Sequence, residues 1–270
     1  MPKIERSTGL SWRKNTTKQE LMIWLGWLIG LSVVTYAWHL VSEKTIWFFV
    51  QDAGTQAMDI GSRMVPPKFT YMDKLWGPVW DTINIATLGT VIALIIAIPV
   101  AFSAAKNTTP HPLIRTVALF IIVSSRSVNS LIWALILVFI CGPGIFAGTI
   151  AIGLRSIGFC AKLLYEAIEE IDHNQVEAIQ ATGASRAQQM LYGIVPQVLP
   201  TFAGVGVYRW DINIRESTIL GLVGAGGIGL QLNGSINTLA WTQVSMILIV
   251  ILGTVIISEW ISAKVRHAII

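Results

Sequence analysis

The chain has 270 residues, of which 53% are hydrophobic and only 13% are charged. In soluble domains about a quarter of the residues are charged. The mean hydropathy of this chain is correspondingly high, at +0.63. The composition excludes an ordinary soluble domain and predicts a protein whose surroundings are a lipid bilayer.

The net charge of +4 does not indicate a nucleic-acid-binding protein. No basic run is interleaved with aromatic residues, and the lysines and arginines stand in short flanks between apolar stretches. Cys141 and Cys160 are too few and too far apart for a disulfide framework or a zinc site with paired cysteines, and no two histidines stand at ligand spacing. We expect no metal site and no nucleic-acid partner.

The first predicted membrane helix is 21–41. This uncharged run of about 20 residues is long enough to cross roughly 30 Å of hydrocarbon, and tryptophans lie toward both its ends, as at membrane interfaces. Its length and the lack of an A-x-A-like site argue against a cleavable signal peptide. A cytoplasmic N-terminal segment is expected at 1–20, and an extracytoplasmic segment whose role stays open is expected at 42–79.

Five further spans are predicted in a transmembrane core at 80–263. The stretch 116–165 is about twice the length of one span, and the turn Cys141-Gly142-Pro143-Gly144 divides it into spans three and four. The other predicted spans are 82–105, 197–220 and 239–261.

Positive charges predict the orientation of these spans. They precede span one, separate spans two and three, and follow span six: Lys3, Arg6, Arg13, Lys14, Lys18, Lys106, Arg115, Lys264 and Arg266. By the positive-inside rule these three flanks are cytoplasmic, and an even number of spans agrees with both termini inside. The loop 166–196 is then cytoplasmic despite its acidic residues, which count weakly in the rule, and 264–270 is a cytoplasmic tail.

The loop 166–196 contains a predicted short helix. We expect Asn174 to cap it, with Glu177 reaching back in a capping box, and a second short helical stretch ends before Pro196. Spacing alone leaves two interpretations open, because such a helix either lies on the membrane surface or is held by another protein.

The residues of this loop resemble a known family. Glu177-Ala178-Ile179, followed by Gly183 and Pro196, is similar to the EAA loop of permease subunits in bacterial ATP-binding-cassette (ABC) importers. Ile179 stands where a third alanine is usual, and Val195 stands where leucine usually precedes the proline. Both departures conserve size and polarity.

A narrower resemblance is to the phosphonate transport permease, and it covers about residue 82 to the C-terminus. It is carried by 177–200 (EAIQATGASRAQQMLYGIVPQVLP), Tyr208-Arg209, Asn213-Ile214-Arg215 and 223–229 (VGAGGIG). The resemblance implies an all-α integral membrane protein of the type I ABC importer fold, with about six transmembrane helices and a short cytoplasmic coupling helix. It also implies a multi-pass protein of the bacterial inner membrane that is a transporter subunit and not an enzyme.

The resemblance implies partners and a mechanism. The coupling helix sits in a groove of a cytoplasmic ATPase dimer, which binds ATP and Mg, so this chain binds no cofactor. A periplasmic phosphonate-type binding protein delivers the substrate. A homodimer is favoured because one chain supplies one loop for two ATPase grooves, and a related second permease chain is the alternative. The implied ATPase-coupling residues are Glu177, Ala178, Gly183, Ala184 and Arg186.

Glycine-rich phosphate-binding patterns do not indicate a nucleotide site in this chain. No G-x-x-x-x-G-K-[ST] occurs in the chain, which supports an ATPase on a separate subunit. The segment 224–229 fits G-x-G-x-x-G, but no acidic residue follows about 20 positions later. We instead expect a flexible or close-packed re-entrant turn near an outer gate, formed by Gly224, Gly226, Gly227 and Gly229.

Charged residues inside the predicted spans are candidates for the translocation pathway, because each costs about 2.5–3.5 kcal/mol to insert. Arg126, Arg155, Arg209 and Arg215 outnumber Asp211 and Glu216 in these spans. The guanidinium fork suits a tetrahedral oxyanion. For Arg215 we favour neutralisation by Asp211 on the same helix face. For the other three arginines, pairing between helices or a place near the interface stays open.

The sequence therefore predicts a permease subunit that imports phosphonate or a related phosphorus oxyanion, such as phosphite or a phosphate ester. Which oxyanion is carried, and whether the permease has its own substrate site, stays open. An ABC permease for another small solute, or an ion-coupled secondary transporter, is the alternative. A secondary transporter would show internal repeats, and neither the EAA segment nor the glycine cluster has a second copy. A membrane enzyme acting on a lipid phosphate lacks a nucleophile or metal cluster.

Overall fold

Apolar runs dominate this sequence, and they form helices because a helix satisfies its own backbone hydrogen bonds in lipid. The computed structural model describes residues 3–6, 9–12 and 15–269. Five of its helices are long and apolar enough to cross a membrane, and a bent pair of helices counts as a sixth span if the pair is taken together. The predicted all-α class with about six membrane helices is confirmed.

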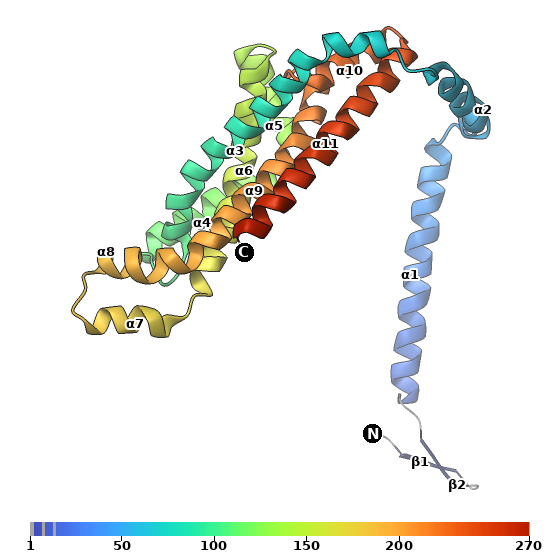
Figure 1. Ribbon diagram of the computed structural model, residues 1–270. Helices are drawn as coiled ribbons and strands as arrows, with labels where there is room; N and C mark the ends of the chain where they lie inside the picture. Colours follow the sequence, from blue (N-terminus) through green and yellow to red (C-terminus); the bar gives the residue numbers. More distant parts are fainter. Residues whose placement is uncertain (1–2, 7–8, 13–14, 270) are drawn as a thin grey trace. The chain divides into compact units, whose positions relative to one another are not determined.

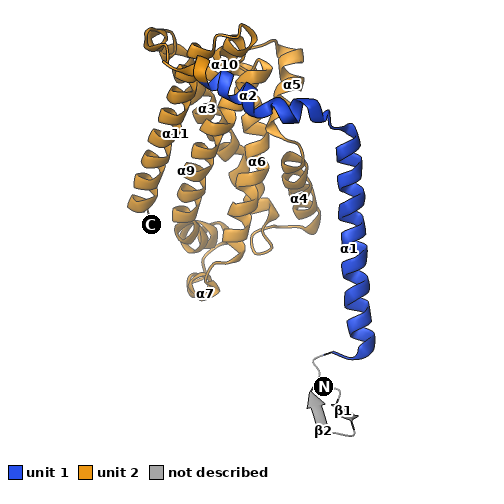
Figure 2. Cartoon of the chain, turned by 90° about the vertical axis from the view of Figure 1, so that its right-hand side faces the viewer, with its two compact units in different colours: residues 1–61 blue, residues 62–270 orange. Residues whose placement is uncertain are grey.

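The chain forms two units, residues 1–61 and 62–270 (Figure 2). In the first, the strands β1 (Lys3–Arg6) and β2 (Gly9–Trp12) pair antiparallel, and they precede α1 (Thr17–Lys44). None of the residues of α1 is buried, so its apolar surface is suited to lipid. Helix α2 (Trp47–Met64) contains the boundary between the units.

The second unit is a helical bundle (Figure 1). Its long helices are α3 (Trp76–Ala104), α6 (Ile145–Glu169), α9 (Val195–Leu220) and α11 (Trp241–Ile269). Shorter elements complete it: η1 (Phe69–Lys74), α4 (Pro112–Ser127), α5 (Ser130–Cys141), α7 (His173–Ala181), α8 (Arg186–Gln189), a π-helical turn (Met190–Ile194), η3 (Gly221–Val223) and α10 (Ile228–Asn237).

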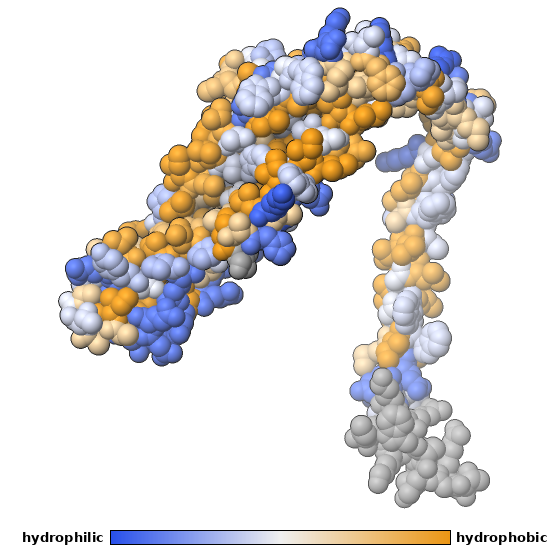
Figure 3. Space-filling view, in the orientation of Figure 1, coloured by the Kyte–Doolittle hydropathy of each residue, from blue (hydrophilic) through white to orange (hydrophobic). Residues whose placement is uncertain are grey.

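Small residues let the helices of this bundle approach closely, which is how membrane helices pack without a hydrophobic driving force between them. The alanines of α3 and α6 form much of one buried cluster. A Cβ on Gly158 of α6 would lie 2.6 Å from the carbonyl oxygen of Ile122 in α4. Figure 3 shows hydrophobic side chains over the middle of the bundle and hydrophilic ones over α7, as expected for a lipid-facing surface with a polar end.

The third predicted span is not one straight helix. Helices α4 and α5 meet at an angle of 86°, and Asn129 begins α5 by accepting a hydrogen bond from the backbone amide of Leu131 at 3.1 Å. An N-cap side chain starts a new helix instead of continuing the old one. The pair is therefore a broken span or a re-entrant loop.

Two local expectations in the coupling loop (166–196) are wrong. The N-cap of α7 is Asp172, whose carboxylate accepts from the amide of Asn174 at 3.0 Å, so Asn174 lies inside the helix and makes no capping box with Glu177. The second helical stretch does not end before Pro196, because α8, the π turn and α9 run on together as 186–223. Pro196 is tolerated in the first turn of α9 because the wider π turn directly precedes it.

Candidate functional site

The coupling loop begins where α6 ends, and the connection between α3 and α4 holds that end. The Glu169 carboxylate accepts from the backbone amide of Lys106 at 2.9 Å and lies 3.9 Å from the cationic nitrogens of Lys106 and Arg115. The Asn107 amide donates to the carbonyl of Ile168 at 2.5 Å. Lys106 and Arg115, which predicted a cytoplasmic flank, thus hold the start of the loop through their contacts with Glu169.

Gln197 at the start of α9 ties the loop to the bundle. Its Oε1 accepts from the backbone amide of Asp172 at 3.0 Å, and its Nε2 donates to the carbonyls of Asp172 at 3.3 Å and Gly193 at 2.7 Å. A Cβ on Gly193 would meet Val176 and Ile179 of α7 at 3.3 to 3.4 Å. Helix α7 is therefore held to α9 by side-chain hydrogen bonds at one end and by close packing along its apolar side.

The predicted coupling residues lie on the outer part of this loop, which projects from one end of the bundle (Figure 1). Glu177, Ala178, Gly183 and Arg186 are exposed, and Ala184 is half-buried. Gly183 ends α7 with φ +81° and donates its amide to the carbonyl of Gln180 at 3.0 Å. Glycine is needed there because other residues rarely adopt a positive φ.

A second group of polar residues lies inside the bundle, between α6 and α9. Arg209 of α9 is 2% exposed, and its Nε donates to the Ser156 hydroxyl at 2.9 Å. Its Nη2 lies 3.4 Å from the Glu216 carboxylate, and its guanidinium stands 5.0 Å from the centre of the Phe159 ring. Asn213 hydrogen bonds to Ser156 at 3.2 Å and to Thr90 of α3 at 2.8 Å.

Arg155 of α6 shares the same carboxylate. Its Nη1 lies 3.4 Å from Glu216 Oε1 and donates to the Asn129 Oδ1 and the Ser130 hydroxyl, both at 3.2 Å. Asn129 and Ser130 stand at the break between α4 and α5. Arg155, Arg209 and Glu216, hereafter the arginine cluster, therefore join three parts of the bundle and carry one surplus positive charge.

The other two predicted pathway arginines are not bonded to the arginine cluster in the described ranges. Arg215 pairs with Asp211 one turn earlier on α9, and the Ser258 hydroxyl of α11 donates to the same carboxylate at 2.9 Å. This is the same-helix neutralisation that the spacing favours. Arg126 is exposed and makes no ion pair with any residue that the structure describes.

The sequence did not predict that Glu216 stands at the centre of this site, between Arg155 and Arg209. Residues 209, 213 and 216 recur at helical spacing, which places their side chains on one face of α9, and this signal was available. Their partners Ser156, Thr90 and Arg155 come from other helices, and no pattern in the sequence connects them. The bridging of two arginines by one carboxylate is a product of helix packing.

The glycine turn at 224–229 is close-packed. Gly224, Gly226 and Gly227 have positive φ angles of 72° to 90°. The amide of Gly144 donates to the carbonyl of Gly224 at 3.0 Å, and a Cβ on Gly227 would lie 2.6 Å from the Thr82 hydroxyl oxygen of α3. Of the two forms that the sequence left open, the structure has the packed one, at the end of the bundle away from α7 (Figure 1).

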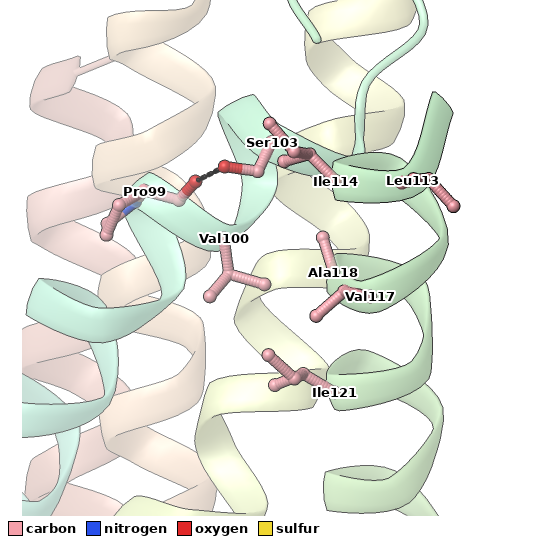
Figure 4. A pocket seen from close by; sticks show the side chains of 8 residues that line it. All are labelled: Pro99, Val100, Ser103, Leu113, Ile114, Val117, Ala118 and Ile121. Atoms are coloured by element: carbon pink, nitrogen blue, oxygen red, sulfur yellow. Dashed lines mark hydrogen bonds between the residues drawn. The ribbon is translucent and has the colours of Figure 1, made fainter. Parts of the chain in front are cut away.

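The cavities of the bundle offer little to an anion. A cavity of about 370 Å³ between α3 and α4 is lined by apolar side chains, and its one hydroxyl, that of Ser103, donates to the carbonyl of Pro99 (Figure 4). A groove of about 480 Å³ along α3, α9 and α11 is also apolar. Among the described residues, no group of three His, Cys, Asp or Glu is placed to hold a metal ion.

Comparison with known proteins assigns this architecture. The model of the family described as "Binding-protein-dependent transport system inner membrane component" matches residues 89–267, which contain the coupling loop and the arginine cluster. The chain belongs to this family. It is a permease subunit of an ABC importer and a multi-pass protein of the inner membrane.

Individual relatives agree with the family. The permease is 38% identical to the phosphite transport system permease protein PtxC of Stutzerimonas stutzeri over 90% of each chain. It is 36% identical to the phosphate-import permease protein PhnE of Mycolicibacterium smegmatis over 81% of this chain and 41% of that protein. Its fold matches a chain of the MetNI methionine ABC transporter, solved in inward-facing conformations, with a TM-score of 0.65, 20% identity, and coverage of 75% of this chain and 99% of that one.

Proposed function

We propose that this permease imports a phosphorus oxyanion, phosphite or a phosphonate, into the cytoplasm. The observation that carries the proposal is the 38% identity with a phosphite permease over nine-tenths of both chains. The arginine cluster supports it, because a surplus positive charge inside the bundle suits an anionic substrate and guanidinium groups match tetrahedral oxyanions. The pathway residues in this proposal are Arg155 and Arg209, with Arg126 and Arg215 as further candidates.

ATP hydrolysis on a separate ATPase dimer, with its own ATP and Mg, drives the import in this proposal. The permease lacks a phosphate-binding G-x-x-x-x-G-K-[ST] loop, and the exposed outer part of its coupling loop is available to a partner. Glu177, Ala178, Gly183, Ala184 and Arg186 would contact the ATPase. The glycine turn lies at the opposite end and would form part of the outer gate, where a periplasmic binding protein delivers the anion.

The proposal includes an orientation in the membrane and an oligomeric state. Lys106 and Arg115 lie against Glu169 at the start of the coupling loop, so the positive-inside rule places that end of the bundle in the cytoplasm. Both termini are then cytoplasmic. A homodimer supplies one coupling loop to each of the two ATPase subunits.

The test is ATP-driven uptake into proteoliposomes that hold the permease, its genomically adjacent ATPase and its binding protein. Labelled phosphite, methylphosphonate, phosphate and sulfate are compared. Uptake of phosphite or methylphosphonate that requires all three proteins supports the proposal, and preference for sulfate overturns the substrate assignment.

The coupling residues are tested in the same vesicles. Glu177→Lys and Gly183→Trp are expected to abolish uptake while the ATPase still binds ATP. Gln175→Lys is the control, because it also introduces a lysine at an exposed position of α7. Equal uptake by Glu177→Lys and Gln175→Lys contradicts the assignment of Glu177 as a docking residue.

A further inference from the structure

The two arginines of the arginine cluster differ in how much of each guanidinium is engaged. Arg209 is buried and uses both Nε and Nη2. Arg155 makes all its contacts through Nη1, and its side chain is 33% exposed. Within the part of the chain that the structure describes, Nε and Nη2 of Arg155 have no hydrogen-bonding partner. One edge of the Arg155 fork, with two parallel N–H donors, is therefore left without a hydrogen-bonding partner among the described residues.

We propose that the Nε–Nη2 edge of Arg155 binds the transported oxyanion through two parallel hydrogen bonds, and that Glu216 is an internal carboxylate that holds Arg155 through Nη1 and weakens anion binding by offsetting positive charge. This inference rests on the proposed function and assigns a substrate site to the permease itself. The ligand class is a tetrahedral oxyanion with two oxygens free to accept, such as phosphite or phosphate.

The contacts of Nη1 explain why the free edge is preorganised. Asn129, Ser130 and Glu216 fix one nitrogen from three directions, and the guanidinium is planar, so the opposite edge is fixed too. Glu216 is itself 16% exposed and held from the other side by Arg209. An anion that binds this edge needs to order little of the protein, which favours binding.

The shared carboxylate also explains how the anion leaves. A transport site must bind strongly enough to admit its substrate and weakly enough to release it. Without Glu216, the two arginines would attract an anion with a combined charge of +2. The arginine cluster, which includes Glu216, has a net charge of +1. Arg155 lies near the middle of α6, so this site is far from both ends of the spanning helix.

The experiment compares Arg155→Lys, Glu216→Gln and Lys162→Gln in the complete transporter. Lysine keeps the positive charge but cannot form the two-pronged contact. We expect Arg155→Lys to lower the phosphite uptake rate at saturating binding protein at least tenfold, which corresponds to about 1.4 kcal/mol. Lys162 lies two turns along α6, pairs with Glu166 and is the matched control, so Lys162→Gln is expected to stay within twofold of wild type.

Glu216→Gln tests whether this carboxylate weakens anion binding by offsetting positive charge. Removal of its charge is expected to lower, about tenfold, the phosphite concentration that stabilises the permease–ATPase complex against heat, and to slow uptake. Assembly is checked by ATPase activity stimulated by the binding protein. If Arg155→Lys does not assemble, Asn129→Ala and Ser130→Ala provide the test, because they loosen Nη1 while keeping Arg155, and each is expected to reduce uptake severalfold.

The outcomes separate this inference from the proposed function. If wild type takes up phosphite and Arg155→Lys does so at the same rate, the inference alone is overturned. If Arg155→Lys does not assemble, unchanged uptake in both Asn129→Ala and Ser130→Ala has the same meaning. Uptake of sulfate in place of phosphite overturns the substrate assignment, and the same variants then test the fork with sulfate. No uptake of any oxyanion by the wild-type transporter overturns both.

Discussion

The attachment of the coupling helix to α9 depends on Gln197, and its removal gives a prediction with a definite size. Gln197→Leu loses the two hydrogen bonds to Asp172 that join α7 to α9, at 3.0 and 3.3 Å, and a third to the Gly193 carbonyl within the continuous helix 186–223. Each bond to Asp172 is exposed, so a net value of about 0.5–1 kcal/mol apiece is appropriate. The contact that holds the start of α7 then weakens by about 1–2 kcal/mol, which raises the detached fraction roughly 5- to 30-fold.

Hydrogen exchange of the amides of α7 measures this detachment directly, because local opening free energies set the protection of each segment. We expect protection at 173–181 to fall by that factor in Gln197→Leu, and transport per ATP hydrolysed to fall with it. Gln197→Glu keeps one acceptor but places a carboxylate against two carbonyls, so it is expected to behave similarly.

Gln175→Leu is the control, because Gln175 is an exposed residue of α7 with no hydrogen bond to α9. Protection of α7 that is the same in Gln197→Leu and wild type, with transport per ATP unchanged, would show that the packing of Gly193 alone holds the helix. The reasoning from the two hydrogen bonds to Asp172 would then be refuted.

Two further predictions concern stability. Gly227→Ala is expected to lower the free energy of unfolding by about 2–4 kcal/mol, because its Cβ would lie 2.6 Å from the Thr82 hydroxyl oxygen at a φ of +72°. Thermal unfolding of the purified permease measures this loss, with Gly234→Ala as the control because a Cβ there meets nothing within 4 Å. Equal melting temperatures of the two variants would contradict the prediction. Arg215→Gln is expected to destabilise by about 1–3 kcal/mol, because it leaves the buried Asp211 carboxylate without its cation. The double variant Asp211→Asn/Arg215→Gln is expected to recover most of this loss in the same assay, and a purely additive loss would contradict the pairing.

The sequence was sufficient where the property is local. Hydropathy located the long membrane helices, because about 20 apolar residues fit one crossing of the hydrocarbon. The spacing of Asp211 and Arg215 predicted their ion pair, because residues four apart share a helix face. The EAA pattern located the short helix α7 and indicated the family.

The sequence was insufficient where two structures compete for the same residues. Asn174 and Asp172 are both good N-caps, and only the path of the chain after α6 selects Asp172. The polar run around Asn129 is compatible with a continuous span as well as with a new helix start, and the structure bends there by 86°. A proline such as Pro196 normally marks the end of a helix, but here the helix continues past it because the π turn directly precedes it.

The amino-acid sequence alone indicated that this chain is a membrane protein, which segments form its long helices and to which transporters it is related. Hydropathy and motif spacing carry this information because they act over a few turns of helix. Tertiary structure alone decided which charges meet. Arg155, Arg209 and Glu216 stand on two helices, and Asn129 stands at the start of a third. Their contact depends on how closely glycine and alanine let those helices pack, and it is this packing that leaves one edge of Arg155 free.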